Sequence, residues 1–570
     1  MAAIVAGGPG ALAADTFRFR GSGYGHGIGM SQWGAYGLAQ QGWGYRRILT
    51  HFYRGTRIQE LSTLPARIRV GLTSGRGTIH LSARNGGVEL WLDGPGDRLV
   101  AKIPWGDTWT VSRAKTEWRY AIRDEAGRLV GGRRWGGPGA PLFATYEDRG
   151  ARVFVPEADE IWGQGFAYAY GFLEFDLTGC GTRCVLRLTN DLPFEKYLRG
   201  LGEMPSSWPA DALRAQAVAA RTYATYGIRR GGLRSECDCH LTDGAGDQVY
   251  VGWNKENGVD GERWRAAVTA TTAQVVTYGG AVIQAFYAAS DGGYSEDVED
   301  VWHGGDPEFA VPYLRGVCDP GEYTAANPWT DWIRSFSAST VTMRLSPYTG
   351  SIGTIRSFAD ARRGRSGRII SVLARGSTGS ARVRGTHLRS ALGLPDGRVW
   401  INEDRNIVGA IRARYDDLMC RPGLARSSVA TFDHGSRQLF AVGGIYRNAR
   451  VNVTVWLKGP LHGEYLQVGG AGGRLGLPVS GTLRPATKAA TTCSSCRRVI
   501  LEGGRIYLES GLGAHALWGA VLSAYLAHGG AQGELGSPIT RVRARDGVRR
   551  ASFEHGTIAC SNGTCDVQVG

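Results

Sequence analysis

The chain has 570 residues and a formal net charge of +15, from 66 basic and 51 acidic side chains. This length exceeds one ordinary hydrophobic core, so about two to four domains are expected. A basic surface attracts polyanions such as nucleic acid, anionic lipid or phosphorylated polymers. No nucleic-acid motif occurs and the arginines are scattered, so we expect no nucleic-acid partner. Two interpretations of the positive charge remain: attraction to an anionic cell envelope, or a surface that only keeps the protein soluble.

The N-terminal stretch predicts export. Ala11-Leu12-Ala13 is a small-x-small cleavage pattern, so residues 1–14 are interpreted as a signal peptide remnant of a secreted protein. No other segment approaches the roughly 18 apolar residues of a membrane span, and none is expected.

The ten cysteines are even in number, and several form short local pairs that predict disulfides in an oxidising compartment. Zinc is the alternative for the Cys-Ser-Ser-Cys stretch, but no second Cys or His pair follows it at zinc-site spacing. The expected pairs are Cys180 with Cys184, Cys318 with Cys420, Cys493 with Cys496, and Cys560 with Cys565.

Four zones follow in chain order. Residues 15–60 form a Gly-rich loop and a helical pattern, and residues 61–185 carry short alternating strands that predict a β-rich domain. Residues 186–405 contain the strongest helices, and residues 425–570 repeat themselves. The 86 glycines, with 17 tryptophans and 23 tyrosines, favour strands, turns and exposed aromatic platforms.

The repeat is clear: the stretch 465–478 returns at 525–538, each copy ending in Leu-Gly-x-Pro. These copies resemble LGFP repeats of wall-associated proteins from mycolic-acid-containing actinobacteria, with Leu477 and Ser537 in place of the Phe. The resemblance implies a module without catalysis that binds wall polysaccharide. A structural appendage without a ligand is the alternative.

Glu203 lies between two predicted helices. Apolar spacing from Phe194 predicts one helix ending near Gly202, and Pro209 suits the first turn of the next. A carboxyl at a helix end, beside apolar Met204, tends toward a raised pKa, as a general acid requires near neutral pH. A surface charge or salt-bridge partner is the alternative.

Gln216 and Arg221 lie off the apolar stripe of the second helix and are expected to point into a site.

The stretch 197–224 resembles the sporulation stage II protein D (SpoIID/LytB) family, as do 247–252, 285–287 and 290–296. The resemblance covers about residues 185–403. It implies an α+β fold, a SpoIID-like catalytic core with an inserted β-rich domain and a C-terminal repeat module. It also implies a peptidoglycan lytic transglycosylase that cleaves MurNAc-GlcNAc strands to 1,6-anhydro-MurNAc ends, with Glu203 as general acid/base and no required cofactor.

The alternative is a non-catalytic glycan-binding or amidase-activating protein of the same fold.

A second signature of the family, Gly-His-Gly followed by Met-Ser-Gln, lies at 25–32, before the core rather than after it. The segment is expected to dock onto the core, with its side chains on sugar or beside Glu203; a Gly-rich turn that caps the following helix is the alternative. The resemblance implies these substrate-binding residues: His26, Ser31, Gln32, Gln216, Arg221, Tyr223, Ser290, Gly292 and Gly293.

Some relatives of the family hold a metal with Cys and His near the Gln-Val-Tyr motif, which begins here at Gln248. Cys237, Cys239 and His240 form a possible structural zinc site in this chain. However, Asp247 occupies the position before Gln248 at which these relatives often have a Cys. Because two cysteines two residues apart rarely bridge each other comfortably, disulfides to other partners are the alternative.

Overall fold

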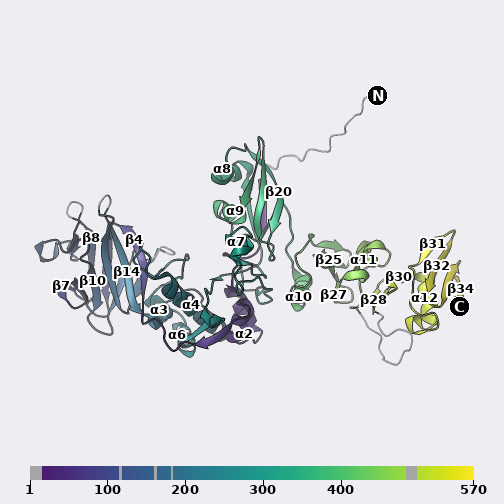
Figure 1. Cartoon of the computed structure of the whole chain (residues 1–570), viewed down its shortest axis with the longest axis horizontal. Coiled ribbons are helices and arrows are strands. Elements are labelled where there is room, and N and C mark those ends of the chain that lie inside the picture. The colour runs from purple at the N-terminus through teal and green to yellow at the C-terminus, as the bar shows by residue number, and fades with distance from the viewer. Residues whose placement is uncertain (1–15, 115–117, 159–162, 181–183, 483–496) are drawn as a thin grey trace.

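The computed structural model describes residues 16–114, 118–158, 163–180, 184–482 and 497–570. The predicted signal peptide and the Cys493–Cys496 pair lie outside these residues. Helices and strands are mixed, so the α+β prediction is confirmed. In the described parts of the chain, no helix is both long and apolar enough to cross a membrane. The β-rich part and the repeats occupy opposite ends of the molecule in Figure 1.

The β-rich part consists of two sheets, a seven-stranded one in the order β15-β4-β14-β13-β10-β6-β7 and a five-stranded one in the order β12-β11-β5-β8-β9. Every second residue of β13 is buried, as strand geometry requires for a sheet with one face in a core. The Tyr120 hydroxyl donates to the carbonyl of Phe175 (2.9 Å) and joins the two sheets. The strands are β4 (Arg67–Arg76), β5 (Thr78–Arg84), β6 (Val88–Leu92), β7 (Arg98–Ile103), β8 (Thr108–Arg113), β9 (Tyr120–Arg123), β10 (Leu142–Tyr146), β11 (Arg152–Val155), β12 (Phe166–Tyr168), β13 (Phe172–Thr178), β14 (Val185–Pro193) and β15 (Leu241–Thr242).

The helical core is built around α4, whose alanines are buried and let neighbouring elements approach closely. It packs against α1, α2, α6 and β16, and β14 leads into the core directly through α3. The elements are α3 (Phe194–Arg199), α4 (Ala210–Gly231), α5 (Trp253–Glu256), α6 (Gly261–Ala270), β16 (Gln274–Tyr278), β17 (Ala281–Val282), β18 (Tyr287–Ala288) and α7 (Val298–Trp302), with a 3-10 turn at Pro307–Phe309.

The N-terminal segment is woven into this core. Its strand β2 pairs parallel with β18, and β3 pairs antiparallel with β16. Its first strand, β1, instead lies between β19 and β23 in a separate small sheet. The elements are β1 (Thr16–Gly21), β2 (Met30–Ser31), α1 (Gln32–Gln40), α2 (Tyr45–Phe52) and β3 (Arg57–Glu60).

A second hydrophobic core lies within the region predicted as one domain at 186–405. Phe17 and Phe19 pack there with apolar residues between Trp332 and Val399. The elements are β19 (Trp332–Ser337), α8 (Ala338–Thr349), β20 (Ile355–Arg363), β21 (Ile369–Gly376), β22 (Ser380–Arg384), α9 (Gly385–Leu392) and β23 (Val399–Ile401).

The described residues contain three repeats, one more than the two copies that the sequence analysis found within the chain. Their helices begin at Gly409, Gly459 and Gly519, each in a left-handed conformation that favours glycine (φ 57°, 58° and 60°). Each helix is followed by an equivalent bridge: Ala425 with Phe440, Pro478 with Leu501, and Pro538 with Phe553. The first copy lacks the Leu-Gly-x-Pro ending, which is why it was missed.

In the second and third copies, the hydroxyls of Tyr465 and Tyr525 donate to the carbonyls of Gly476 and Gly536 (2.5 and 2.7 Å). The elements are α10 (Gly409–Asp417), β24 (Ala430–Phe432), β25 (Gly435–Leu439), β26 (Gly444–Asn448), β27 (Val453–Leu457), α11 (Gly459–Gln467), β28 (Arg497–Leu501), β29 (Gly504–Glu509), β30 (Gly513–Trp518), α12 (Gly519–Ala527), β31 (Arg543–Arg545), β32 (Val548–Phe553), β33 (Gly556–Ser561) and β34 (Thr564–Val569).

Three predicted disulfides are confirmed: Cys180–Cys184, Cys318–Cys420 and Cys560–Cys565. The second spans 102 residues and ties the first repeat to the core. A long loop closed in this way restricts the unfolded chain and thereby stabilises the fold.

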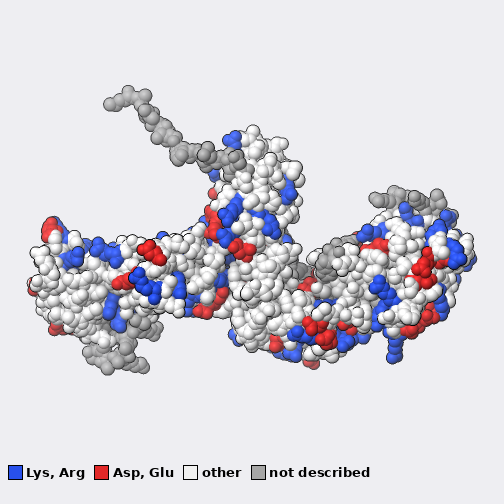
Figure 2. All heavy atoms as spheres, turned by 180° about the vertical axis from the view of Figure 1, so that it is seen from behind, with Lys and Arg blue, Asp and Glu red and all other residues white. Residues whose placement is uncertain are grey.

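Charged side chains are spread rather than gathered. Figure 2 shows Lys and Arg along the whole visible face, with Asp and Glu between them. This distribution provides no single basic stripe on that face.

Candidate functional site

A cavity of about 460 Å³ lies where the N-terminal segment meets the helical core. Four of the predicted site residues line it together: His26, Gln32, Glu203 and Tyr223. The remaining wall consists of Tyr24, Gly25, Ala245, Gly246, Asp247, Val249, Phe286, Tyr287, Ala288, Ala289, Trp302 and Arg389.

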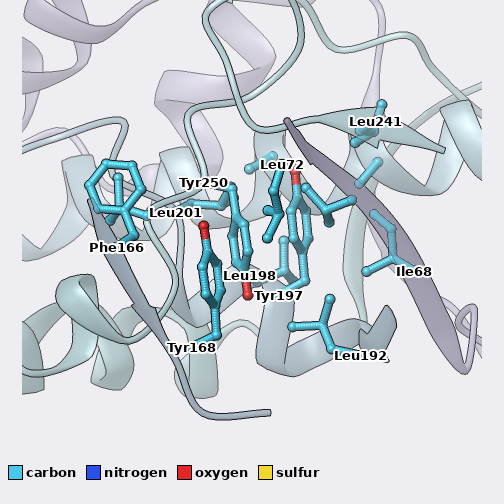
Figure 3. Packing of buried hydrophobic residues seen from close by; sticks show 14 of the residues in the cluster. Ile68, Leu72, Phe166, Tyr168, Leu192, Tyr197, Leu198, Leu201, Leu241 and Tyr250 are labelled. Carbon is cyan, nitrogen blue, oxygen red and sulfur yellow. The ribbon is translucent and has the colours of Figure 1, made fainter. Parts of the chain in front are cut away.

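The backbone just before Glu203 is fixed by pairing with residues 249 and 250. Gly202 N–H donates to the carbonyl of Val249 (2.8 Å), and Leu201 forms a bridge with Tyr250. Figure 3 shows Leu201 and Tyr250 packed with Tyr197 in the buried cluster beneath this turn. A Cβ on Gly202 would lie 2.9 Å from the Val251 side chain, so glycine permits the close approach.

The local structure corrects one reason given for the Glu203 prediction. Helix α3 ends at Arg199 rather than near Gly202, so Glu203 lies beyond the helix end. The effect of a helix terminus falls off within its last turn. The perturbation of Glu203 therefore has another cause.

That cause is burial, which raises the pKa of the Glu203 carboxyl above its ordinary value. Hydrogen bonds from Val249 N–H (2.7 Å) and the Tyr287 hydroxyl (2.9 Å), both to Oε1, oppose the rise. Oε2 has only a long contact from the Gln32 amide (3.4 Å). The two oxygens are thus unequal, and Oε2 is the one left for a proton.

Lys255 lies behind the site, where its ammonium donates to the carbonyl of Met204. Burial lowers the pKa of Lys255 to about 8, and the nearby Glu203 opposes this shift. In return, the positive charge of Lys255 moderates the raised pKa of Glu203.

A chain of neutral hydrogen bonds fixes the Tyr287 hydroxyl. Gln248 Nε2 donates to it (2.8 Å), and Gln248 Oε1 accepts from the Tyr197 hydroxyl (3.0 Å). On the other side of Glu203, Gln32 Nε2 also donates to Gln216 Oε1 (3.3 Å). Gln216 is fully buried and positions Gln32 instead of lining the cavity.

His26 is neutral in this setting. Burial and the positive charges of Arg389 and Arg368 lower the pKa of His26 to about 3. Its Nδ1 accepts from Ile28 N–H (3.0 Å), which leaves the other ring nitrogen protonated. His26 thus organises the glycine loop at the cavity wall, and no hydrogen bond among the described residues joins it to Glu203.

Asp247 is a second carboxylate in the wall, but its oxygens are occupied. Arg234 binds both of them (2.7 Å each), and Thr242 and the Tyr223 hydroxyl donate to them as well. These bonds lower the pKa of Asp247 below its ordinary value against the effect of burial. Asp247 is therefore a structural anion that orients Tyr223.

Aromatic rings and one cation complete the wall. Tyr24 is 45% exposed and stacks on Trp329 (4.1 Å between centroids), and Trp302 is 37% exposed against Phe286. Exposed rings of this kind present flat apolar faces with polar edges, suited to sugar rings. Arg389 donates through Nε to a backbone carbonyl (3.2 Å) and has no carboxylate partner among the described residues.

Arg221 lies elsewhere, which corrects the expectation that it points into the site. It is a fully buried residue of α4 and binds Glu195 (2.8 and 3.0 Å) and the carbonyl of Val268 (3.1 Å). Its helical position indicated a polar face, but that face packs against α3 and α6.

Ser31, Ser290, Gly292 and Gly293 also lie outside the cavity. Behind it, the buried carboxylate of Glu322 accepts from Ser31 Oγ (2.7 Å), Ser290 Oγ and Gly292 N–H (3.2 Å), whereas Gly293 N–H donates to Asp291 (2.8 Å).

The cysteines of the possible zinc site provide neither free thiolates for a metal nor disulfides with other cysteines. Cys237 and Cys239 form a disulfide with each other, so the expectation of separate partners is wrong. Nδ1 of His240 accepts from Arg69 N–H (3.0 Å). A disulfide offers no thiolate to a metal, so the zinc set stays a prediction for the reduced chain only.

Sequence reasoning missed Tyr287, Lys255, Trp302 and Arg389 as parts of the site. Tyr287 belongs to a stretch that carried the resemblance, which was its only signal. Arg389 also belongs to a stretch, 387–389, that resembles the distal part of the family, whereas Lys255 and Trp302 are separated from Glu203 in the chain and carry no motif.

Comparison with known proteins adds family matches in two places. The model of the SpoIID family, described as stage II sporulation protein, matches residues 183–278, and the LGFP repeat matches residues 475–533.

Three curated relatives align with part of the chain. An uncharacterized protein of Brachyspira hyodysenteriae (strain ATCC 49526 / WA1) is 36% identical over 25% of this chain and 37% of its own length. The amidase enhancer of Bacillus subtilis (strain 168) is 39% identical over 20% and 13%, and stage II sporulation protein D of Bacillus amyloliquefaciens is 28% identical over 23% and 39%. The chain spans less than half the length of these relatives.

Proposed function

Because the chain contains a SpoIID domain and an LGFP repeat, we propose that it is a secreted lytic transglycosylase acting on the glycan strands of the cell wall. The observation that carries this proposal is Glu203 itself. Its carboxyl has a raised pKa and lies in the wall of an open cavity, with one oxygen held by donors and the other left for a proton.

In the proposed reaction, protonated Glu203 donates through Oε2 to the oxygen that links MurNAc C1 to GlcNAc. The bond between C1 and that oxygen breaks, and the GlcNAc end leaves as an alcohol. The carboxylate then takes the proton of the MurNAc C6 hydroxyl as O6 bonds to C1. The products are a 1,6-anhydro sugar and a regenerated acid, with no water consumed.

The single-carboxyl arrangement favours this reaction over hydrolysis. Most glycoside hydrolases use two carboxyl groups, of which one activates water or attacks the sugar. Asp247 is the other carboxylate in the cavity wall, and Arg234 occupies both its oxygens. The internal nucleophile of the sugar makes a second carboxylate unnecessary.

The repeats supply the proposed attachment to the wall. They carry no part of the cavity wall described above. We assign to them binding of wall polysaccharide, which would keep the enzyme at its substrate.

The test is product analysis on peptidoglycan stripped of stem peptides. The unmodified chain is expected to release 1,6-anhydro-MurNAc ends, and Glu203→Gln to release them at least about 100-fold more slowly. Glu262→Gln, an exposed residue of α6, is the matched control and should behave as the unmodified chain. Reducing MurNAc ends would refute the transglycosylase and indicate hydrolysis.

An activator of a wall amidase is the second candidate, favoured by the relative named amidase enhancer. If the chain binds glycan without forming anhydro ends and stimulates an added wall amidase equally with and without Glu203→Gln, this candidate replaces the first.

A further inference from the structure

Three acidic side chains meet behind the cavity, outside the site described above. Asp291, Asp319 and Glu322 are at most 1% exposed, and each offers a carboxylate oxygen within 4.8 Å of the others. Asp291 belongs to the loop after β18, and the other two follow the disulfide-bonded Cys318. We call this set the acidic cluster.

Each aspartate of the cluster has one oxygen bound and one free. Gly293 N–H donates to Asp291 Oδ1 (2.8 Å), and Gly321 N–H donates to Asp319 Oδ1 (2.9 Å). The Oδ2 atoms of Asp291 and Asp319 are buried and have no hydrogen-bond partner among the residues that the structure describes. A buried polar atom without a partner costs about 1–3 kcal/mol, and more if it is charged.

Neighbouring arginines do not balance the three carboxyls. Arg368 pairs with Asp396, and Arg412 pairs with Asp416. Arg398 is the remaining guanidinium whose charge acts on Asp291, and it donates to the Ser366 carbonyl and the Ser22 hydroxyl. Like charges this close are unfavourable in a buried setting, so a cation or bound protons must relieve them.

We propose that Asp291, Asp319 and Glu322 bind one hard divalent cation, with Ca²⁺ as the best fit. The donor set is entirely carboxylate oxygen, which suits Ca²⁺ or Mg²⁺ rather than zinc or copper. Ca²⁺ accepts irregular oxygen geometry, whereas Mg²⁺ demands a near-octahedral site with several waters.

The cation would have a structural role that reaches the cavity. Glu322 Oε2 accepts from Ser31, and the next residue, Gln32, donates to Glu203. A cation on Glu322 would therefore hold the N-terminal segment against the loops at 291 and 319. None of the three carboxyls lines the cavity, and the existence of the cation site does not depend on the proposed reaction.

The test uses the full chain after dialysis against a chelator. Calorimetric titration with CaCl₂ is expected to show one bound ion per chain, with MgCl₂ binding more weakly at the same site. At Ca²⁺ about 100 times the dissociation constant, the midpoint of thermal unfolding of the core should rise by roughly 5–10 °C.

Asp319→Asn and Asp291→Asn should abolish the binding, whereas Glu308→Gln, an exposed residue nearby, should leave it unchanged. If an aspartate variant does not fold, Tb³⁺ luminescence of the unmodified chain, displaced by Ca²⁺ at one site, gives the same answer. Glu203→Gln should bind Ca²⁺ normally, which separates this proposal from the proposed reaction.

If neither ion binds at millimolar concentration and the thermal midpoint does not change, the proposal is overturned. Shared protons would then neutralise the negative charge of the three carboxyls. Equal loss of binding in Asp319→Asn and Glu308→Gln would overturn it as well.

Discussion

Two adjacent residues of the N-terminal segment contact carboxyl groups that lie in two different environments. Gln32 contacts Glu203, a single carboxyl that faces a cavity and is surrounded by neutral donors and one lysine. Ser31 contacts Glu322, which is fully buried beside two more carboxyls. The comparison teaches that burial alone does not define a catalytic acid.

The difference lies in what can relieve the charge. At Glu203 a single proton on a single oxygen suffices, and the cavity lets that proton reach a ligand. In the acidic cluster three carboxyls compete, and none of them lines the cavity beside Glu203. The first environment suits proton transfer, and the second suits a held cation.

The largest expected effect sharpens the Glu203 side of the comparison. Glu203→Gln should lower the turnover of glycan about 10²- to 10⁴-fold, since general acid–base catalysis contributes about that much. The thermal midpoint should not fall, because the amide keeps the shape and removes a desolvated carboxyl. Turnover assays and thermal unfolding of the same sample check both. A midpoint lowered by several degrees would instead identify Glu203 as structural.

The next effect concerns Glu296, a buried acid that belongs neither to the cavity nor to the acidic cluster. Its Oε2 accepts a hydrogen bond from the Ser366 hydroxyl (2.5 Å). Burial raises the pKa of Glu296 from 4.5 to about 7, so the folded chain holds this proton more tightly than the unfolded one. As the pH rises from 4.5 to about 7, the unfolded chain releases its proton first, and folding stability falls by about 3 kcal/mol before levelling off.

Glu296→Gln should remove this decline, as measured by urea unfolding of the core on both sides of that pH range. The exposed Glu308→Gln serves as control. An identical decline in both variants would assign it to another group.

Tyr287→Phe tests the donor on Glu203 Oε1. This hydrogen bond lowers the pKa of Glu203, so its loss should raise that pKa. Because the acid must be protonated, the basic limb of the pH–rate profile should move to higher pH, and turnover should fall roughly 10-fold. Tyr197→Phe, two hydrogen bonds further along the chain through Gln248, should have a smaller effect. A basic limb that stays in place would show that Tyr287 does not act on Glu203.

The smallest expected effects separate the two neighbours. Gln32→Ala should move the basic limb slightly to higher pH, because its amide also lowers the pKa of Glu203. Ser31→Ala removes the N-cap of α1 and a bond to Glu322, and should lower stability by about 1 kcal/mol without moving that limb. If both variants give the same two readouts, the segment acts as one unit and the comparison fails.

The candidate acid was predictable because its motif is local. Glu203, with the turn that contains it, lies within one continuous stretch, and the displaced Gly-His-Gly segment was placed beside it by resemblance. Arg221 shows where this reasoning stops. Its helical position was read as facing a site, whereas the packing of α3 and α6 against that face made it a buried partner of Glu195.

The repeats show the same limit. Two copies carry the Leu-Gly-x-Pro pattern, whereas the copy beginning at Gly409 keeps the helix with its glycine start, the tyrosine six residues later and the bridge but lacks that pattern. Its fold similarity depends on packing, which many sequences satisfy.

The sequence by itself determined the mixed fold, the disulfides Cys180–Cys184 and Cys560–Cys565 and the candidate acid, because each depends on residues close in the chain or on a continuous motif. Tertiary structure alone decided which oxygen of Glu203 is free, that His26 is neutral and that three carboxyls meet behind the cavity. These properties depend on burial and on partners far away in sequence, such as Gln32, which is 171 residues from Glu203. Charge and protonation follow distance in space, and only the folded chain sets that distance.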